Sequence, residues 1–206
     1  MNKEDLLKHI AETGYNVGFG SKRHFATFDI IEKTPSIIAF FSLAVGIFAL
    51  VSEALSTKSM SATFLVLGIL GVYISSWQNK KDDYAAAGIK LTQLFNELKC
   101  LYLTVKSEVE SDLQMHRDEL KDIENRYYET SISDQILFSD WAAHYKFFWQ
   151  HQISWISEQR KFGFFRDKVP LSFTLLVFLA FGVGISVFFD FASVSSCFAI
   201  AQKVKG

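Results

Sequence analysis

The sequence has few of the residues that build disulfide or metal sites, and it lacks the short motifs of the common hydrolase classes. Its two cysteines, Cys100 and Cys197, are isolated and have no Cys-x-x-Cys spacing, so neither a disulfide nor a zinc site is expected. No G-x-S-x-G and no H-E-x-x-H motif is present. The net charge of -1 argues against a surface that coats nucleic acid. We therefore expect a protein that is not an enzyme, uses no cofactor or metal and binds no nucleic acid directly.

The glycines near the N-terminus do not form a nucleotide-binding motif. Gly14, Gly18 and Gly20 fail the pattern G-x-x-x-x-G-K-[ST] because position 19 is Phe, and Arg23 stands where G-x-G-x-x-G requires its third glycine. We expect these glycines to break a first short helix, with Ser21 as the N-cap of the next. The following residues Lys22, Arg23 and His24 would contact lipid headgroups or the neighbouring cytoplasmic helices, or, less favoured, an anionic signal at the bilayer surface.

Charged side chains are absent from three long stretches, residues 35–52, 59–78 and 169–189. Each approaches the ~20 apolar residues that a helix needs to cross a ~30 Å hydrocarbon core. The sequence therefore predicts an all-α membrane protein, with a transmembrane hairpin over 35–78 and a third transmembrane helix over 169–190. The alternative for the first two stretches is a hairpin buried in a soluble core. Because residues 2–33 are charged throughout, no cleavable signal peptide is expected.

Basic residues set the expected orientation. Lys33 precedes the first stretch, Lys80 and Lys81 follow the second, and Lys161 and Lys168 precede the third. The positive-inside bias then places residues 1–34, as cytoplasmic or interfacial helices, and residues 79–168 on the cytoplasmic side of a bacterial inner membrane. The tail over 191–206 would leave on the outer side, although its two lysines argue the other way.

Proline is absent from residues 79–168, which hold only two glycines, so long uninterrupted helices are expected there. Apolar residues at steps of three and four predict a first amphipathic helix. Its stripe consists of Tyr84, Ala87, Leu91, Leu94, Leu98, Leu101 and Val105. A second helix, capped by Ser131 or Ser133, has the stripe Leu137, Trp141, Tyr145, Phe148, Gln152 and Trp155. The simplest arrangement of the two is a long antiparallel hairpin.

Small residues share one face of each uncharged stretch. These faces consist of Ala39, Ser42, Gly46, Ala49 and Glu53 in the first, of Ser61, Gly68, Gly71 and Ser75 in the second, and of Gly182, Ser186 and Asp190 in the third. Small residues allow helix backbones to approach closely in lipid. The faces would pack the hairpin against itself and the third helix, or some of them would face oligomer neighbours or line a water path, with Glu53 and Asp190 near its outer mouth.

The order of these segments resembles the SLATT family of bacterial two-transmembrane effector domains. A basic, aromatic entry segment "SKRHFATFDIIEK" is followed by the stretches "PSIIAFFSLAVGIFALV" and "FLVLGILGVYISSW", and then by the helix "YAAAGIKLTQLFNELKCLY". The resemblance covers about residues 1–165 and rests on layout, because the family has no catalytic signature to carry over. The third uncharged stretch goes beyond its two-span core.

The resemblance implies a membrane effector of a conflict or antiphage system that forms a pore or disrupts the inner membrane when a partner signals infection. It also implies homo-oligomers in the lipid bilayer and a nucleotide-signal synthase, sensor or reverse transcriptase as partner. The alternative is a non-conducting anchor that recruits a cytoplasmic partner through residues 79–168.

Overall fold

The computed structural model describes residues 2–52, 55, 57–108, 113–151, 153–163 and 167–182. The chain divides into two compact units, Met1–Lys161 and Phe162–Gly206. Helices and connecting segments, but no strand, make up these described residues. The predicted all-α class is thus confirmed.

The first helix, α1 (Lys3–Ala49), is continuous over 47 residues, about 70 Å at 1.5 Å per residue. Asn2 caps it, since its side chain accepts a hydrogen bond from the Asp5 N–H at 2.8 Å and its own N–H donates to the Asp5 carboxylate at 3.3 Å. The helix runs through the N-terminal glycines and through Pro35. The predicted break at the glycines, with a cap at Ser21, is therefore wrong.

Two of these glycines serve close packing instead of a turn. A Cβ atom on Gly14 would lie 2.3 Å from Cη2 of Trp155, and a Cβ atom on Gly18 would lie 2.7 Å from Cδ2 of Phe95. Neither glycine has a positive φ, so their backbones are compatible with a helix. The absence of a side chain thus lets bulky aromatic rings approach the α1 backbone.

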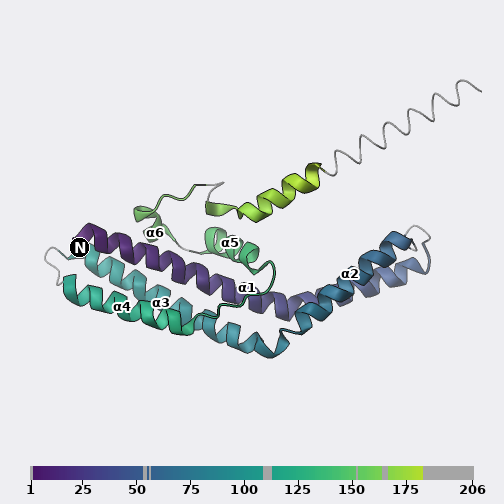
Figure 1. Cartoon of the computed structure of the whole chain (residues 1–206), viewed down its shortest axis with the longest axis horizontal. Coiled ribbons are helices and arrows are strands. Elements are labelled where there is room, and N and C mark those ends of the chain that lie inside the picture. The colour runs from purple at the N-terminus through teal and green to yellow at the C-terminus, as the bar shows by residue number, and fades with distance from the viewer. Residues whose placement is uncertain are drawn as a thin grey trace, which may run out of the picture. The chain divides into compact units, whose positions relative to one another are not determined.

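A three-helix bundle forms where α3 (Lys81–Ser107) and α4 (Leu113–Thr130) pack against the first half of α1 (Figure 1). All seven residues of the predicted α3 stripe are buried. Leu120 and Ile123 of α4 complete the core beside α3 and α1. This face could be predicted because the apolar residues of α3 recur at the period of a helix and form one broad stripe.

The predicted second long helix is wrong in its extent and in part of its buried face. Residues 131–136 are not helical, and the remainder forms α5 (Ser139–Gln150) and α6 (Ser154–Gln159), which both contact α1. Instead, α3 packs against α1 and α4. On α5 the buried residues are Ser139, Ala143 and Phe147. Leu137 and Tyr145 of the predicted stripe are exposed, whereas Trp155 of α6 is buried; Gln152 lies outside the described residues.

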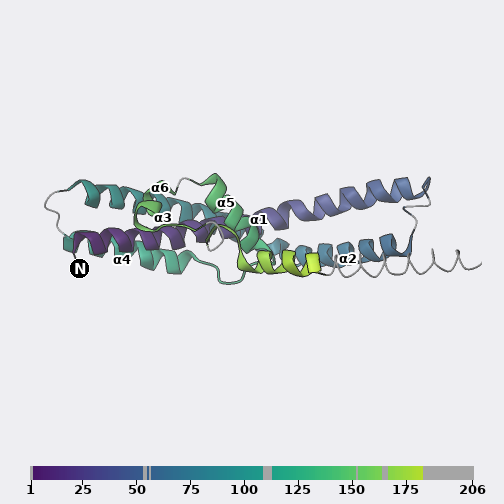
Figure 2. The ribbon, with the colours of Figure 1, turned by 90° about the horizontal axis from the view of Figure 1, so that it is seen from above.

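The second apolar segment forms α2 (Lys58–Ser75), which ends three residues before the predicted boundary. The Thr57 side chain caps it by accepting a hydrogen bond from the Met60 N–H at 3.3 Å. A 3₁₀ turn, η2 (Gln78–Lys80), joins it to α3. Figure 2 shows α2 and the second half of α1 extending together away from the bundle.

In the second unit the described residues include a short apolar helix, Leu171–Gly182. It follows Pro170, in agreement with the predicted start of the third uncharged stretch. Residues 183–206, which hold Ser186, Asp190 and the predicted tail, lie outside the described residues. The third transmembrane helix stays a prediction.

Candidate functional site at the bases of the apolar helices

Large apolar side chains cover the outside of α2 and of the second half of α1. The exposed ones include Ile37, Phe40, Phe41, Leu43, Ile47 and Phe48 in α1 and Leu65, Val66, Ile69 and Val72 in α2. Only 6% of the most apolar 18-residue window of each helix is buried. A helix in a soluble core would bury such residues. The two helices are thus long and apolar enough to cross a membrane, and the soluble alternative is disfavoured.

The small residues of these helices divide into two groups. Ser42, Ala49 and Gly71 are half-buried, whereas Ala39, Gly46, Ser61, Gly68 and Ser75 are exposed. A Cβ atom on Gly46, Gly68 or Gly71 would meet no heavy atom within 4 Å. Within one chain these glycines therefore serve no close helix approach among the described residues. Gly182 is exposed on its own helix, and Glu53 lies outside the described residues.

Ion pairs surround the bases of both helices. Lys33 pairs with Asp29 at 2.6 Å, Lys81 pairs with Glu32 at 2.5 Å, and Lys146 of α5 also pairs with Asp29. Burial of Asp29 opposes its ionisation, but the hydrogen bonds from Lys146 and Lys33 outweigh this and lower the pKa of its carboxyl. The hydrogen bond to Glu32 raises the pKa of Lys81. This end of the bundle is therefore held by charged as well as apolar contacts.

An apolar cluster joins the bundle to both apolar helices. It consists of Ile31 of α1, Ile74 of α2, Tyr84 of α3 and Ile136, with Phe28, Ile30, Trp77 and Ile132 packed against it. Four separate segments of the chain therefore meet at the bases of α1 and α2. We call this cluster the junction.

Buried polar side chains of the bundle hold residues 131–138 in place. Nε2 of His24 accepts a hydrogen bond from the Ile132 N–H at 3.0 Å, and Thr27 donates to the side-chain oxygen of Gln135 at 2.6 Å. The hydroxyl of Tyr84 donates to the carbonyl of Asp134 at 2.7 Å. Two of these bonds satisfy backbone groups of this non-helical segment, the Ile132 N–H and the Asp134 carbonyl, and the third holds the Gln135 side chain.

Lys22, Arg23 and His24 lie in the part of α1 that packs in the bundle, and their contacts with lipid headgroups or an anionic signal stay predictions. His24 is buried, and Arg23 pairs with Asp140 of α5 at 2.7 Å. Lys22 is half-buried, and its burial together with nearby Lys146 lowers its pKa. All three lie a dozen residues or so before Pro35, about 18 Å along α1.

Replacing His24 with alanine is expected to destabilise the protein by about 1–3 kcal/mol, because the Ile132 N–H loses its acceptor in a buried site. Chemical unfolding of the detergent-solubilised chain measures the effect. Arg126→Ala is the control: it removes ion pairs with Glu97, at 2.6 Å, and with Asp122, at 2.8 Å, and exposed pairs of this kind are each worth about 0–1 kcal/mol. Equal losses of unfolding free energy in the two variants would contradict the conclusion that His24 holds residues 131–138 in place.

Sequence reasoning missed the residues that hold the junction together. Thr27, Gln135 and Ile136 carry no motif, and they meet only through contacts between segments about 110 residues apart. Within the described ranges, no group of three or more His, Cys, Asp or Glu side chains is placed to hold a metal ion. The arrangement is therefore one of packing and charge around two apolar helices.

A comparison with protein families gave a match over most of the chain. The family described as "SMODS and SLOG-associating 2TM effector domain 6", SLATT_6, matches residues 1–177. Comparisons with curated proteins and with solved structures gave no match. The match covers the whole of the bundle, both apolar helices and the junction, and it ends within the helix Leu171–Gly182.

Proposed function

Because the chain belongs to the SLATT family of two-transmembrane effectors of conflict systems, we propose that it is a bacterial antiphage effector that permeabilises the inner membrane. α1 and α2 form a transmembrane hairpin, with residues 1–34 and 79–168 in the cytoplasm. A partner or nucleotide signal, supplied by a signal synthase, sensor or reverse transcriptase, acts on the bundle. No catalytic step by this chain is part of the proposal.

The observation that carries the proposal is the exposure of the apolar faces of two helices that are both rooted in one packed bundle. Lys33, Lys80 and Lys81 at their bases fit the positive-inside bias. A signal can activate such a protein only if it binds the active state more tightly than the resting state. The junction offers a path for this difference, because it joins residues of the bundle to the bases of both spans.

Assembly of several chains would then follow from the small-residue faces. Gly46 and Gly68 are exposed and make no close contact among the described residues, so they can approach another copy in lipid. The opened state is a homo-oligomer whose helices line a water path or disorder the bilayer.

Inducible expression in bacteria, followed with a membrane-potential dye, tests the function. Overproduction of the chain together with its native partners is expected to depolarise cells. Gly46→Leu should abolish most of the dye response, because a larger side chain fits within one chain but blocks close helix approach between chains. Val66→Leu, on an exposed face of α2 without a glycine, is the matched control and should depolarise like the wild type.

The same experiment separates the effector from a non-conducting anchor. An anchor that recruits a cytoplasmic partner would never depolarise cells, with or without its partners, although the protein would still be found in the membrane fraction. That result would refute the effector function. Depolarisation that persists unchanged in Gly46→Leu would instead refute assembly through this face.

A further inference from the structure

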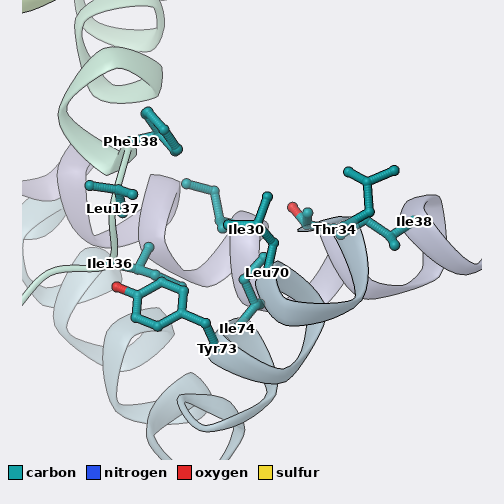
Figure 3. A pocket seen from close by; sticks show the side chains of 10 residues that line it. Ile30, Thr34, Ile38, Leu70, Tyr73, Ile74, Ile136, Leu137 and Phe138 are labelled. Carbon is teal, nitrogen blue, oxygen red and sulfur yellow. The ribbon is translucent and has the colours of Figure 1, made fainter. Parts of the chain in front are cut away.

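A cavity of about 330 Å³ lies between the bases of α1 and α2, next to the junction. Its walls come from three parts of the chain, as Figure 3 shows. Ile30 and Ile38 belong to α1, Leu70 and Ile74 belong to α2, and residues 136–138 close the side that faces α5. The cavity therefore exists only while these three segments keep their spacing.

The lining of the cavity selects a hydrocarbon ligand. None of the lining residues carries a charge, and Thr34 and Tyr73 contribute the only side-chain oxygens, as Figure 3 shows. A ligand with buried charge or several hydrogen-bonding groups would lose its hydration here without compensation. An unbranched or branched hydrocarbon chain suits such walls.

The volume of the cavity lies at the lower end of the range for small-molecule pockets, about 300–1,000 Å³.

The rim of the cavity continues into the apolar outer surface of the spans. Leu137 and Phe138 line the cavity and are 55% and 49% exposed, respectively. Phe138 adopts a left-handed backbone conformation with φ 69°, which costs free energy for a residue with a side chain and commonly marks functional sites. The side chains of Leu137 and Phe138 thus lie next to the bases of α1 and α2, where the two helices would enter the bilayer.

We infer that this cavity binds an acyl chain of a membrane phospholipid from the cytoplasmic leaflet. The inference rests on the proposed function in two respects, namely that α1 and α2 lie in the bilayer and that their ends next to the bundle face the cytoplasm. The cavity lies at the cytoplasmic ends of both spans, where Thr34 directly precedes Pro35 and Ile74 is near the end of α2. A bound chain touches α1, α2 and residues 136–138 at once, and it thereby stabilises the spacing of the two helices in the resting protein.

Native mass spectrometry of the full chain in detergent tests the inference, with added phosphatidylglycerol as the probe. The wild type is expected to retain one phospholipid per chain. Thr34→Trp fills the cavity and should weaken this binding about tenfold or more. Ile37→Trp adds the same side chain to the same helix at an exposed position, and should bind like the wild type. Leu70→Trp fills the cavity from α2 and should reproduce Thr34→Trp.

Several outcomes would overturn the inference. One is a wild type that stays in membranes after alkaline extraction but retains no phospholipid. Another is equal lipid binding by Thr34→Trp and Ile37→Trp, and a third is a change of oligomeric mass in the filled variants without a change in bound lipid. If circular dichroism shows that a filled variant has not folded, the other filled variant and the wild-type titration decide. A wild type that alkaline extraction releases from membranes would refute the proposed function itself.

Discussion

Gly14→Ala is expected to destabilise the protein by about 1–3 kcal/mol, although alanine normally stabilises a helix relative to glycine. The new Cβ atom would lie 2.3 Å from Cη2 of the buried Trp155 ring, so the ring or the backbone has to move. Chemical unfolding followed by circular dichroism measures the loss.

Gly20→Ala in the same helix is the matched control for this variant. Its Cβ atom would make only an ordinary contact, at 3.4 Å from Tyr127. The gain in helix propensity should therefore stabilise the protein by up to about 1 kcal/mol. Opposite signs of the two substitutions are the expected result.

A double-mutant cycle with Trp155 identifies the cause. Trp155→Ala alone should cost about 3–5 kcal/mol, because the ring is buried between Phe95 and Tyr102. In that background Gly14→Ala should be neutral or stabilising, which gives a coupling energy of about 1–3 kcal/mol. If Gly14→Ala costs the same with and without Trp155, the close approach of the ring is not what requires glycine.

Stability is expected to fall as the pH drops from about 6.5 to about 4. Burial, followed by the charges of Lys22 and Lys99, lowers the pKa of His151 from its ordinary value of 6.5 to about 4. Burial also lowers the pKa of His24, with a contribution from Arg23, although the hydrogen bond to Gly20 opposes the shift. In this window the unfolded chain binds protons that the folded chain does not.

The packing of His151 determines how much stability is lost at low pH and which substitution serves as the control. Its ring packs against Phe95 at 4.5 Å and Phe147 at 6.0 Å between ring centroids. The loss from this residue is at most about 3 kcal/mol, and less because the ring is only partly buried. Equilibrium unfolding across this pH range measures it. His151→Phe should reduce the slope of the unfolding free energy against pH in this range. Above pH ~7 His151 is neutral in the folded and the unfolded chain, so the unfolding free energy should not depend on pH through this residue.

Part of any loss below pH 4.5 would have another origin. Asp29 has a lowered pKa because its hydrogen bonds to Lys146 and Lys33 outweigh its burial, so it loses its stabilising contribution only at lower pH. The range between about 6.5 and 4.5 therefore reports mainly on the histidines. A flat profile over that range would show that His151 and His24 are not buried as neutral rings.

The residues of α3 illustrate what can be predicted locally. Its apolar positions follow the period of a helix on a polar background, so one face alone can be buried, and all seven predicted residues are. The α5 region illustrates the opposite case. Aromatic residues occur on several of its faces, so periodicity could not separate the buried Phe147 from the exposed Tyr145.

The sequence by itself determined the all-α class, the two apolar helices, the α3 face and the family resemblance, because uncharged length and helical period are local properties of a chain. Tertiary structure decided the rest. Gly14 and Gly18 lie inside the continuous helix α1, and glycine is required there because a Cβ atom would collide with Trp155 or Phe95. Residues 131–136 are not helical, and the backbone groups of Ile132 and Asp134 pair instead with the side chains of His24 and Tyr84, over 45 residues away along the chain. Such partners are brought together only by folding, and no local pattern encodes them.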